Sequence, residues 1–146
     1  ITPKYACCIY ATAPFVKAEF LHAGLNKMIT TSCSTAFSVT SFAFPIYRGL
    51  KINADGSTGM LWPENELVRS QDLPEAYHDA GQFYWVNCNQ FNHQARLYNE
   101  DSRPIIIPRK YVHDIDTQED WELAQAMHQA LGLDTANEKI TRVNES

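Results

Sequence analysis

The chain has 146 residues, of which 45% are hydrophobic and 20% charged, and its formal net charge is −5. That length fits one ordinary domain with one core. The composition is too apolar for a disordered protein and too interrupted for a fibrous one. The negative charge, without a cluster of Lys and Arg, argues against partners bound by phosphate-backbone neutralisation, such as long DNA or RNA.

No segment of the chain reads as a membrane or export signal. No apolar run approaches the roughly 20 residues that span a bilayer. The sequence begins Ile-Thr-Pro-Lys without an initiator Met, and it lacks the basic start and small-residue cleavage site of a secretory leader. We therefore expect a cytoplasmic protein whose start is incomplete. The four cysteines lack zinc-ligand spacing, so we interpret them as reduced structural residues.

The chain opens with a strand, a loop and a helix. Residues 5–10 form a short continuous apolar run, which predicts a strand covered on both faces in a parallel sheet. Residues 11–14 read as a turn, and apolar side chains recur at helical spacing from Ala18 to Ile29. Because ligands bind beyond the carboxyl ends of strands in open parallel sheets, Tyr10 to Pro14 is a candidate site by position.

The next segment leaves this strand-helix rhythm. Residues 37–41 alternate apolar and polar types and predict a second strand. Apolar or long side chains then occupy alternate positions from Ile46 to Ile52, and Asn53 to Gly56 follow as a turn before a second short run that ends at Trp62. This pattern predicts an inserted β-hairpin that extends to about Asp72.

The last third returns to strands and a helix. Residues 81–86 and 103–108 are apolar runs that predict strands, and the prolines of the second run suggest a sheet edge. Residues 87–102 read as a loop or a surface helix. Thr117 is the expected N-cap of a helix with Trp121, Ala124, Met127 and Leu131 on one stripe, and Gly132 ends it.

These elements predict an α/β fold in four stretches. Residues 1–43 and 73–134 form the core, and residues 44–72 form the inserted hairpin. Residues 135–146 form a polar tail that frays at its end.

Two groups of residues suggest chemistry on spacing alone. In an extended stretch the carboxylates of Asp114 and Asp116 would point to one side and could hold one hard cation, although Asp is also common before a helix as a cap. His78 and Asp79, which precede the strand predicted over residues 81–86, could form a general-base pair, but neighbours in sequence seldom point the same way, so plain loop residues are the alternative.

Five motifs, taken together and in order, resemble the acylneuraminate cytidylyltransferase family, and its pseudaminic acid branch in particular. They are residues 7–15 (CCIYATAPF), 37–42 (FSVTSF), 69–73 (RSQDL), 77–85 (YHDAGQFYW), and 114–117 (DIDT) with 120–122 (DWE). A series in sequence order is more specific than any one motif. The resemblance implies a Rossmann-like three-layer nucleotidyltransferase core and a hairpin insertion through which two subunits form a homodimer.

The resemblance also implies a reaction and its cofactor. The anomeric hydroxyl of a nine-carbon acidic sugar would attack the α-phosphate of CTP and release pyrophosphate, and magnesium would be required. Asp114 and Asp116 would be its carboxylate ligands. Differences from the sialic acid members at Tyr10 and around Asp79 favour pseudaminic acid, and sialic acid is the alternative substrate.

By the same resemblance, seven further residues would bind the sugar. Tyr10 and Thr12 would line the pocket, and Arg69 and Gln71 would lie near its mouth. The hydroxyl and acylamido groups of the sugar would be bound by Asp79, Gln82 and Tyr84. An Arg suits a carboxylate, but a surface pair of Arg69 with Asp72 is the other interpretation.

One family feature has no counterpart here. Members begin with a Gly-rich basic loop of the type Ala-Arg-Gly-Gly-Ser-Lys-Arg that holds the CTP phosphates. We therefore expect this chain to be a C-terminal portion of the enzyme. The alternative is a non-catalytic module that dimerises and binds sugar without transfer chemistry.

Overall fold

The structure is a computed structural model that describes residues 3–94 and 96–133. The predicted polar tail, residues 135–146, lies outside the described residues. The fold is mixed α/β with a four-stranded mixed sheet in the order β1-β5-β2-β6. Its strands are β1 (Tyr5–Ile9), β2 (Thr35–Ser41), β5 (Tyr77–Asn87) and β6 (Ser102–Ile106). In the described part of the chain, no helix is long and apolar enough to cross a membrane.

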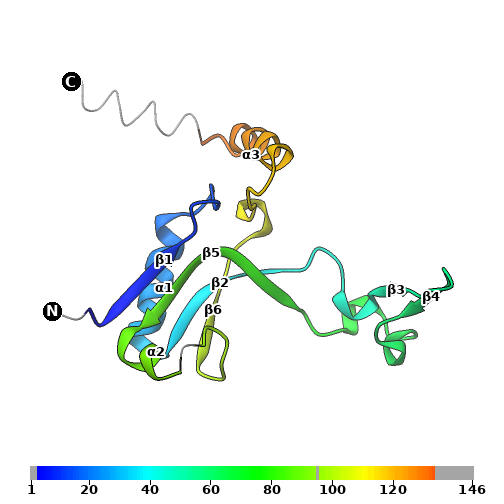
Figure 1. The fold of residues 1–146 in the computed structure, drawn as a ribbon, viewed down its shortest axis with the longest axis horizontal. Helices are drawn as coiled ribbons and strands as arrows, with labels where there is room; N and C mark the ends of the chain where they lie inside the picture. The colour runs from blue at the N-terminus through cyan, green and yellow to red at the C-terminus, as the bar shows by residue number, and fades with distance from the viewer. Residues whose placement is uncertain (1–2, 95, 134–146) are drawn as a thin grey trace.

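Three strands of this sheet run in the same direction. β5 is antiparallel to both β1 and β2, and β2 is parallel to β6. The carboxyl ends of β1, β2 and β6 therefore meet at one edge of the sheet (Figure 1). β6 is an edge strand, as its prolines predicted, and Pro104 pairs with Phe37.

The first strand is present, but the prediction that it lies in a parallel sheet with both faces covered was wrong. β1 lies at the sheet edge, its only strand partner among the described residues is the antiparallel β5, and Ile9 is 50% exposed. A continuous apolar run identifies a strand but does not reveal which of its faces are covered.

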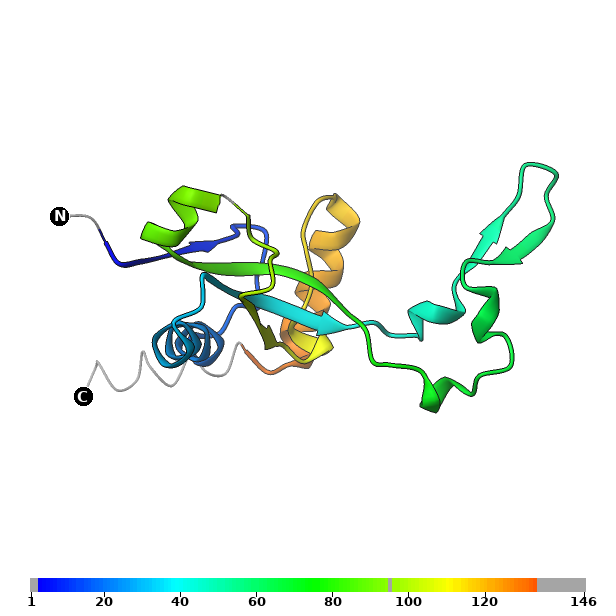
Figure 2. The same ribbon diagram turned by 90° about the horizontal axis from the view of Figure 1, so that it is seen from below.

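Helix α1 (Ala18–Thr31) covers one face of the sheet, and α2 (Cys88–Gln94) lies on the opposite face (Figure 2). Beneath α1 the core contains Met28, Cys33, Ala36 and Phe83, all fully buried. The helix approaches β5 closely: a Cβ on Gly24 would lie 2.5 Å from Cδ1 of Trp85. Glycine thus costs some helix propensity here but lets the two elements pack.

Residues 42–76, here called the arm, project from the sheet between β2 and β5 (Figure 1). The arm contains the hairpin of β3 (Leu50–Ile52) and β4 (Thr58–Met60), as predicted, and the short 3-10 helices η1 (Ile46–Arg48), η2 (Pro63–Asn65) and η3 (Ser70–Asp72). The alternating residues from Ile46 had predicted a longer strand, which is wrong because Ile46 to Arg48 form a turn closed by a hydrogen bond from Gly49 N–H to the Ile46 carbonyl.

The last elements follow β6. Helix η4 (Arg109–Tyr111) leads through an irregular stretch to α3 (Gln118–Ala130). Thr117 is the N-cap, as predicted, and Gly132 after the helix has φ +65°. Of the predicted stripe, Ala124 is buried whereas Trp121 is 50% exposed.

Candidate functional site

The carboxyl ends of β1 and β6 bring the predicted site residues of distant segments together. After β1, the Tyr10 N–H donates to the Gln82 carbonyl of β5 at 2.9 Å. After η4, the Ile115 N–H donates to the Thr12 carbonyl at 3.2 Å. We call the resulting group the strand-end cluster: Tyr10, Thr12, Asp79, Gln82, Tyr84, Asp114 and Asp116.

A bulge in β5 shapes this cluster. Phe37 of β2 pairs with Tyr84 and Val39 pairs with Asp79, so Ser38 alone stands opposite residues 80–83. The Ser38 hydroxyl fills the gap and accepts from the N–H groups of Gln82 and Phe83, both at 3.2 Å. Within the bulge Gly81 has φ +62°, a conformation that favours glycine. Its α-carbon lies beside Asp114, whose Oδ2 would be 3.9 Å from a Cβ there.

Asp79 is held by three donors. The hydroxyls of Tyr84 and Tyr98 donate to Oδ2 at 2.7 and 2.5 Å, and the Gly81 N–H donates to Oδ1 at 2.8 Å. His78 and Asp79 lie within β5, whereas the sequence placed them before that strand. The His78 ring packs against Phe42 in a tilted arrangement, with centroids 4.8 Å apart, and its Nδ1 contacts the Asp79 carbonyl oxygen rather than the carboxylate, so the structure does not support a His78–Asp79 base pair.

The two tyrosine hydroxyls stay protonated at neutral pH. Burial, and next the hydrogen bond to Asp79, raise the pKa of Tyr84 well above its ordinary value. The hydrogen bond to Asp79, and next burial, raise the pKa of Tyr98 to about 12. Both residues therefore act as donors to the carboxylate rather than as acids or bases.

Gln82 is fully buried. Its Nε2 donates to the Tyr111 carbonyl, and among the described residues its Oε1 has no hydrogen-bond partner. This contact ties β5 to η4, three residues before Asp114. The structure therefore places Gln82 beneath the surface of the strand-end cluster, where it supports the backbone.

Arg69 and Gln71 do not join the strand-end cluster. Both lie on the arm, which extends away from the sheet (Figure 1). Arg69 forms a two-point ion pair with Asp72, with Nε–Oδ2 2.7 Å and Nη2–Oδ1 3.2 Å. The surface pair that the sequence left open is therefore present, and within one chain neither residue meets the other candidates.

The two candidate metal ligands are exposed carboxylates in an irregular stretch. Asp114 Oδ1 accepts from the Ile115 N–H at 3.1 Å, so most of its acceptor capacity is unused. Among the described residues, no group of three or more His, Cys, Asp or Glu could hold a metal ion. A magnesium site does not need such a group, because proteins often bind this ion through one or two carboxylates while substrate phosphates and water complete the shell.

A capping box fixes the backbone next to Asp116. The Asp120 N–H donates to the Thr117 hydroxyl at 3.2 Å, and Asp120 Oδ2 accepts from the N–H groups of Thr117 and Asp116 at 2.8 and 3.2 Å. The Thr117 hydroxyl, and next these N–H groups, lower the pKa of Asp120. The start of α3 thus orients the chain that carries the candidate ligand.

The capping box gives a stability prediction with a pH dependence. We expect Thr117→Ala to lower the free energy of unfolding by about 1 kcal/mol at pH 7, whereas Thr117→Ser should retain most of it. Because the folded-state pKa of Asp120 is lowered, its contribution is present above its ordinary pKa of 3.8 and is lost as pH falls through the folded value. Urea unfolding at pH 7 and pH 3 should therefore show a smaller Ala effect in acid. An equal effect at both pH values would contradict this role of Asp120.

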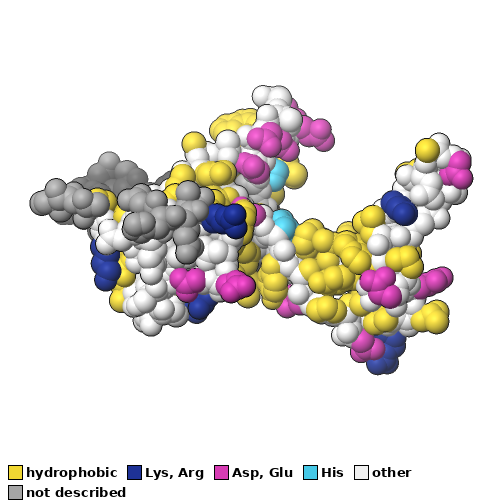
Figure 3. Space-filling view, turned by 60° about the horizontal axis from the view of Figure 1, so that its bottom comes forward, with side chains coloured by type: hydrophobic (Ala, Val, Ile, Leu, Met, Phe, Trp, Pro, Cys, Tyr) yellow, Lys and Arg dark blue, Asp and Glu magenta, His cyan; other side chains and the backbone are white. Residues whose placement is uncertain are grey.

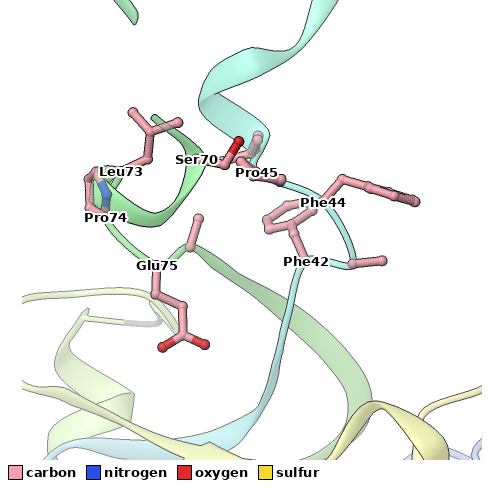
Figure 4. A pocket seen from close by; sticks show the side chains of 10 residues that line it. Phe42, Phe44, Pro45, Ser70, Leu73, Pro74 and Glu75 are labelled. Atoms are coloured by element: carbon pink, nitrogen blue, oxygen red, sulfur yellow. The ribbon is translucent and has the colours of Figure 1, made fainter. Parts of the chain in front are cut away.

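Besides a small hollow of about 110 Å³ beside Ile115, which no residue of the strand-end cluster lines, the molecule has two larger hollows that bear on these residues. An apolar hollow of about 390 Å³ adjoins Tyr10 and Tyr84 and is otherwise lined by Ala6, Cys7, Cys8, Val86, Phe91 and Leu97. The other, of about 290 Å³, lies at the neck of the arm between Phe42 to Ile46 and Leu73 to Ala76, with Ser70 (Figure 4). No predicted site residue lines the neck hollow, so the first hollow is the one that belongs with the strand-end cluster.

Sequence comparison identifies relatives but no family model. No family model matches the chain. The chain is 34% identical over 124 residues to two Campylobacter jejuni proteins named pseudaminic acid cytidylyltransferase, covering 85% of this chain and 53% of each relative. It is 26% identical over 127 residues to a Helicobacter pylori protein named pseudaminic acid cytidylyltransferase and UDP-2,4-diacetamido-2,4,6-trideoxy-beta-L-altropyranose hydrolase, covering 85% of this chain and 24% of that relative.

These similarities confirm the resemblance that the five motifs indicated. They cover most of the described residues, and the chain spans about half the length of the two Campylobacter relatives.

Proposed function

We propose that this chain forms part of a cytidylyltransferase that transfers CMP from CTP to the anomeric hydroxyl of pseudaminic acid and releases pyrophosphate. The observation that carries the proposal is the 34% identity over 85% of the chain to proteins of that name. The contacts that bring Tyr10, Asp79 and Tyr84 together, and the backbone bond that ties Ile115 to Thr12, support it. Relatives named for sialic acid are absent from these matches, so the sialic acid alternative gains no support.

The reaction requires one anion to approach another. The anomeric oxygen of the sugar forms a bond to the α-phosphorus of CTP, the bond from that phosphorus to the bridging oxygen breaks, and the hydroxyl proton is released. Asp114 and Asp116 would hold magnesium, which when bound offsets the repulsion between the triphosphate and the sugar carboxylate. The proposed core is Rossmann-like, with this site at the carboxyl ends of its strands.

The strand-end cluster suggests an orientation for the sugar. Asp79 would repel the sugar carboxylate, so the acidic end should lie toward Asp114 and Asp116 with their cation. The hydroxyl and acylamido groups should lie toward Asp79 and Tyr84. The adjoining apolar hollow suits the methyl of an acylamido group, because it is lined by Cys8, Val86 and other apolar side chains.

The proposal is tested with the full-length gene product. Pyrophosphate release should require CTP, magnesium and a nonulosonic acid together. With pseudaminate, sialate and legionaminate compared side by side, pseudaminate should give the highest kcat/KM. Release without any sugar, or faster turnover of sialate, would contradict the proposal.

A further inference from the structure

Tyr98 is a member of the Asp79 network that the motifs did not indicate. It lies in the irregular segment between α2 and β6, far along the chain from Asp79. Its ring meets the Phe37 ring edge-on with centroids 5.1 Å apart, and its hydroxyl donates to Asp79 Oδ2. The ring is thus placed by a packing contact, and the hydroxyl is placed by the carboxylate.

The network determines what Asp79 can offer a ligand. An ionised carboxylate has about four acceptor positions, and Tyr84, Tyr98 and the Gly81 N–H use three of them. One remains for a donor such as a sugar hydroxyl. Without Tyr98, the carboxylate would lose one of the two donors that fix Oδ2.

The same carboxylate connects the sugar side of the site to the metal side. Asp79 Oδ1 accepts from the N–H of Gly81, which stands in the bulge with φ +62° and lies beside Asp114. A rotation of the Asp79 carboxylate would take away the acceptor of that N–H and loosen this side of the bulge, which the Ser38 hydroxyl holds on the other. The orientation of the Asp79 carboxylate therefore affects both the sugar side of the strand-end cluster and the segment beside Asp114.

We propose that Tyr98 is a positioning residue for sugar binding, acting through Asp79 and the bulge of β5. The inference rests on the proposed function, because it takes the strand-end cluster to be the sugar site. Tyr98 acts together with Tyr84, but it differs in exposure: Tyr84 is buried and Tyr98 is 60% exposed. Removing the Tyr98 hydroxyl therefore leaves the core of the sheet unchanged.

The variant is Tyr98→Phe in the full-length enzyme, which keeps the ring on Phe37 and removes only the hydroxyl. Tyr77→Phe is the matched control, because the Tyr77 hydroxyl likewise donates to a carboxylate, that of Glu75, at 2.6 Å, but Tyr77 lies at the start of β5, outside the cluster. We expect the KM for the sugar to rise about tenfold in Tyr98→Phe, the usual effect of losing one hydrogen bond to a charged group. The KM for CTP, and both KM values in the control, should remain near those of the wild type.

A second readout does not depend on turnover. Exchange of the Gly81 amide proton, followed by NMR, should be faster in Tyr98→Phe and unchanged in Tyr77→Phe. An unchanged sugar KM, an equal rise in the KM for CTP, or unchanged Gly81 exchange would each overturn the inference.

If the wild-type protein releases no pyrophosphate, the proposed function fails, and calorimetric binding of pseudaminate decides the role of Tyr98 separately. Binding about tenfold weaker in Tyr98→Phe than in wild type would support it. Equal binding, or no binding by the wild type, would overturn it.

Discussion

Replacing Asp116 by Asn is expected to abolish pyrophosphate release, lowering kcat by roughly a thousandfold or more. The amide keeps the size of the side chain but removes the charge that a divalent cation requires. Asp116 is exposed, and its carboxylate forms no hydrogen bond or ion pair with the residues that the structure describes, so the variant should fold normally. Asp114→Asn should have a similar effect, and removal of magnesium by EDTA should reproduce it in the wild type.

Glu119→Gln is the matched control for this experiment. Glu119 is an exposed acid in the first turn of α3, three residues beyond Asp116, so its replacement removes the same charge from the same region. It should leave kcat unchanged. If Asp116→Asn retained most of the wild-type rate, or if Glu119→Gln lost as much, a specific metal role for Asp116 would be wrong.

The arm carries the surface through which we expect two copies of the chain to associate. It exposes a series of large apolar side chains: Phe44 (83%), Leu50 (63%), Ile52 (82%), Leu61 (51%) and Leu67 (95%). Figure 3 shows hydrophobic side chains gathered over the neck and along the arm. Exposed apolar surface of this kind marks an interface, and a symmetric dimer is the commonest way for copies of one chain to bury it.

We therefore expect a homodimer, and we expect Ile52→Asp to weaken it about a hundredfold, because an unpaired carboxylate would be buried. Trp62, at which the predicted second run of the hairpin ends, is half-buried and packs on Tyr47 within its own arm, with ring centroids 5.6 Å apart. Its contribution should be smaller than that of Ile52.

Light scattering measures this change directly. Leu123→Asp is the control, since Leu123 is 52% exposed on α3, away from the arm. The wild type and the control should be dimers and Ile52→Asp a monomer at the same concentration. Arg69 and Gln71 lie on the arm, so activity should fall with the dimer if the arm of one subunit serves the site of the other. A monomeric wild type would contradict the dimer.

Local rules predicted the parts of the fold that local interactions determine. The helix beginning at Ala18, the Thr117 cap, the turn after Ile52 and the edge position of the proline-containing strand are all present. Each follows from helical periodicity, capping or turn chemistry within a few residues. The position of the candidate site after the first strand came from the rule that ligands bind at carboxyl strand ends, and it stays a prediction.

What the sequence missed depends on contacts between distant segments. The bulge of β5 forms where the Ser38 hydroxyl of the neighbouring strand β2 accepts hydrogen bonds from two backbone N–H groups. Tyr98, which follows α2 in the sequence, donates to Asp79, which precedes α2. Neither contact follows a sequence spacing that could be recognised in a single sequence. The burial of Gln82 follows from the same bulge, so its position under the site was equally hidden.

The proposed magnesium site can be tested by locating the cation in crystals. Crystals of the full-length protein grown with CTP and soaked with manganese in place of magnesium should show an anomalous peak bound by Asp114 and Asp116, beside the nucleotide phosphates. A peak held by other residues, with these two carboxylates turned toward solvent, would contradict the account.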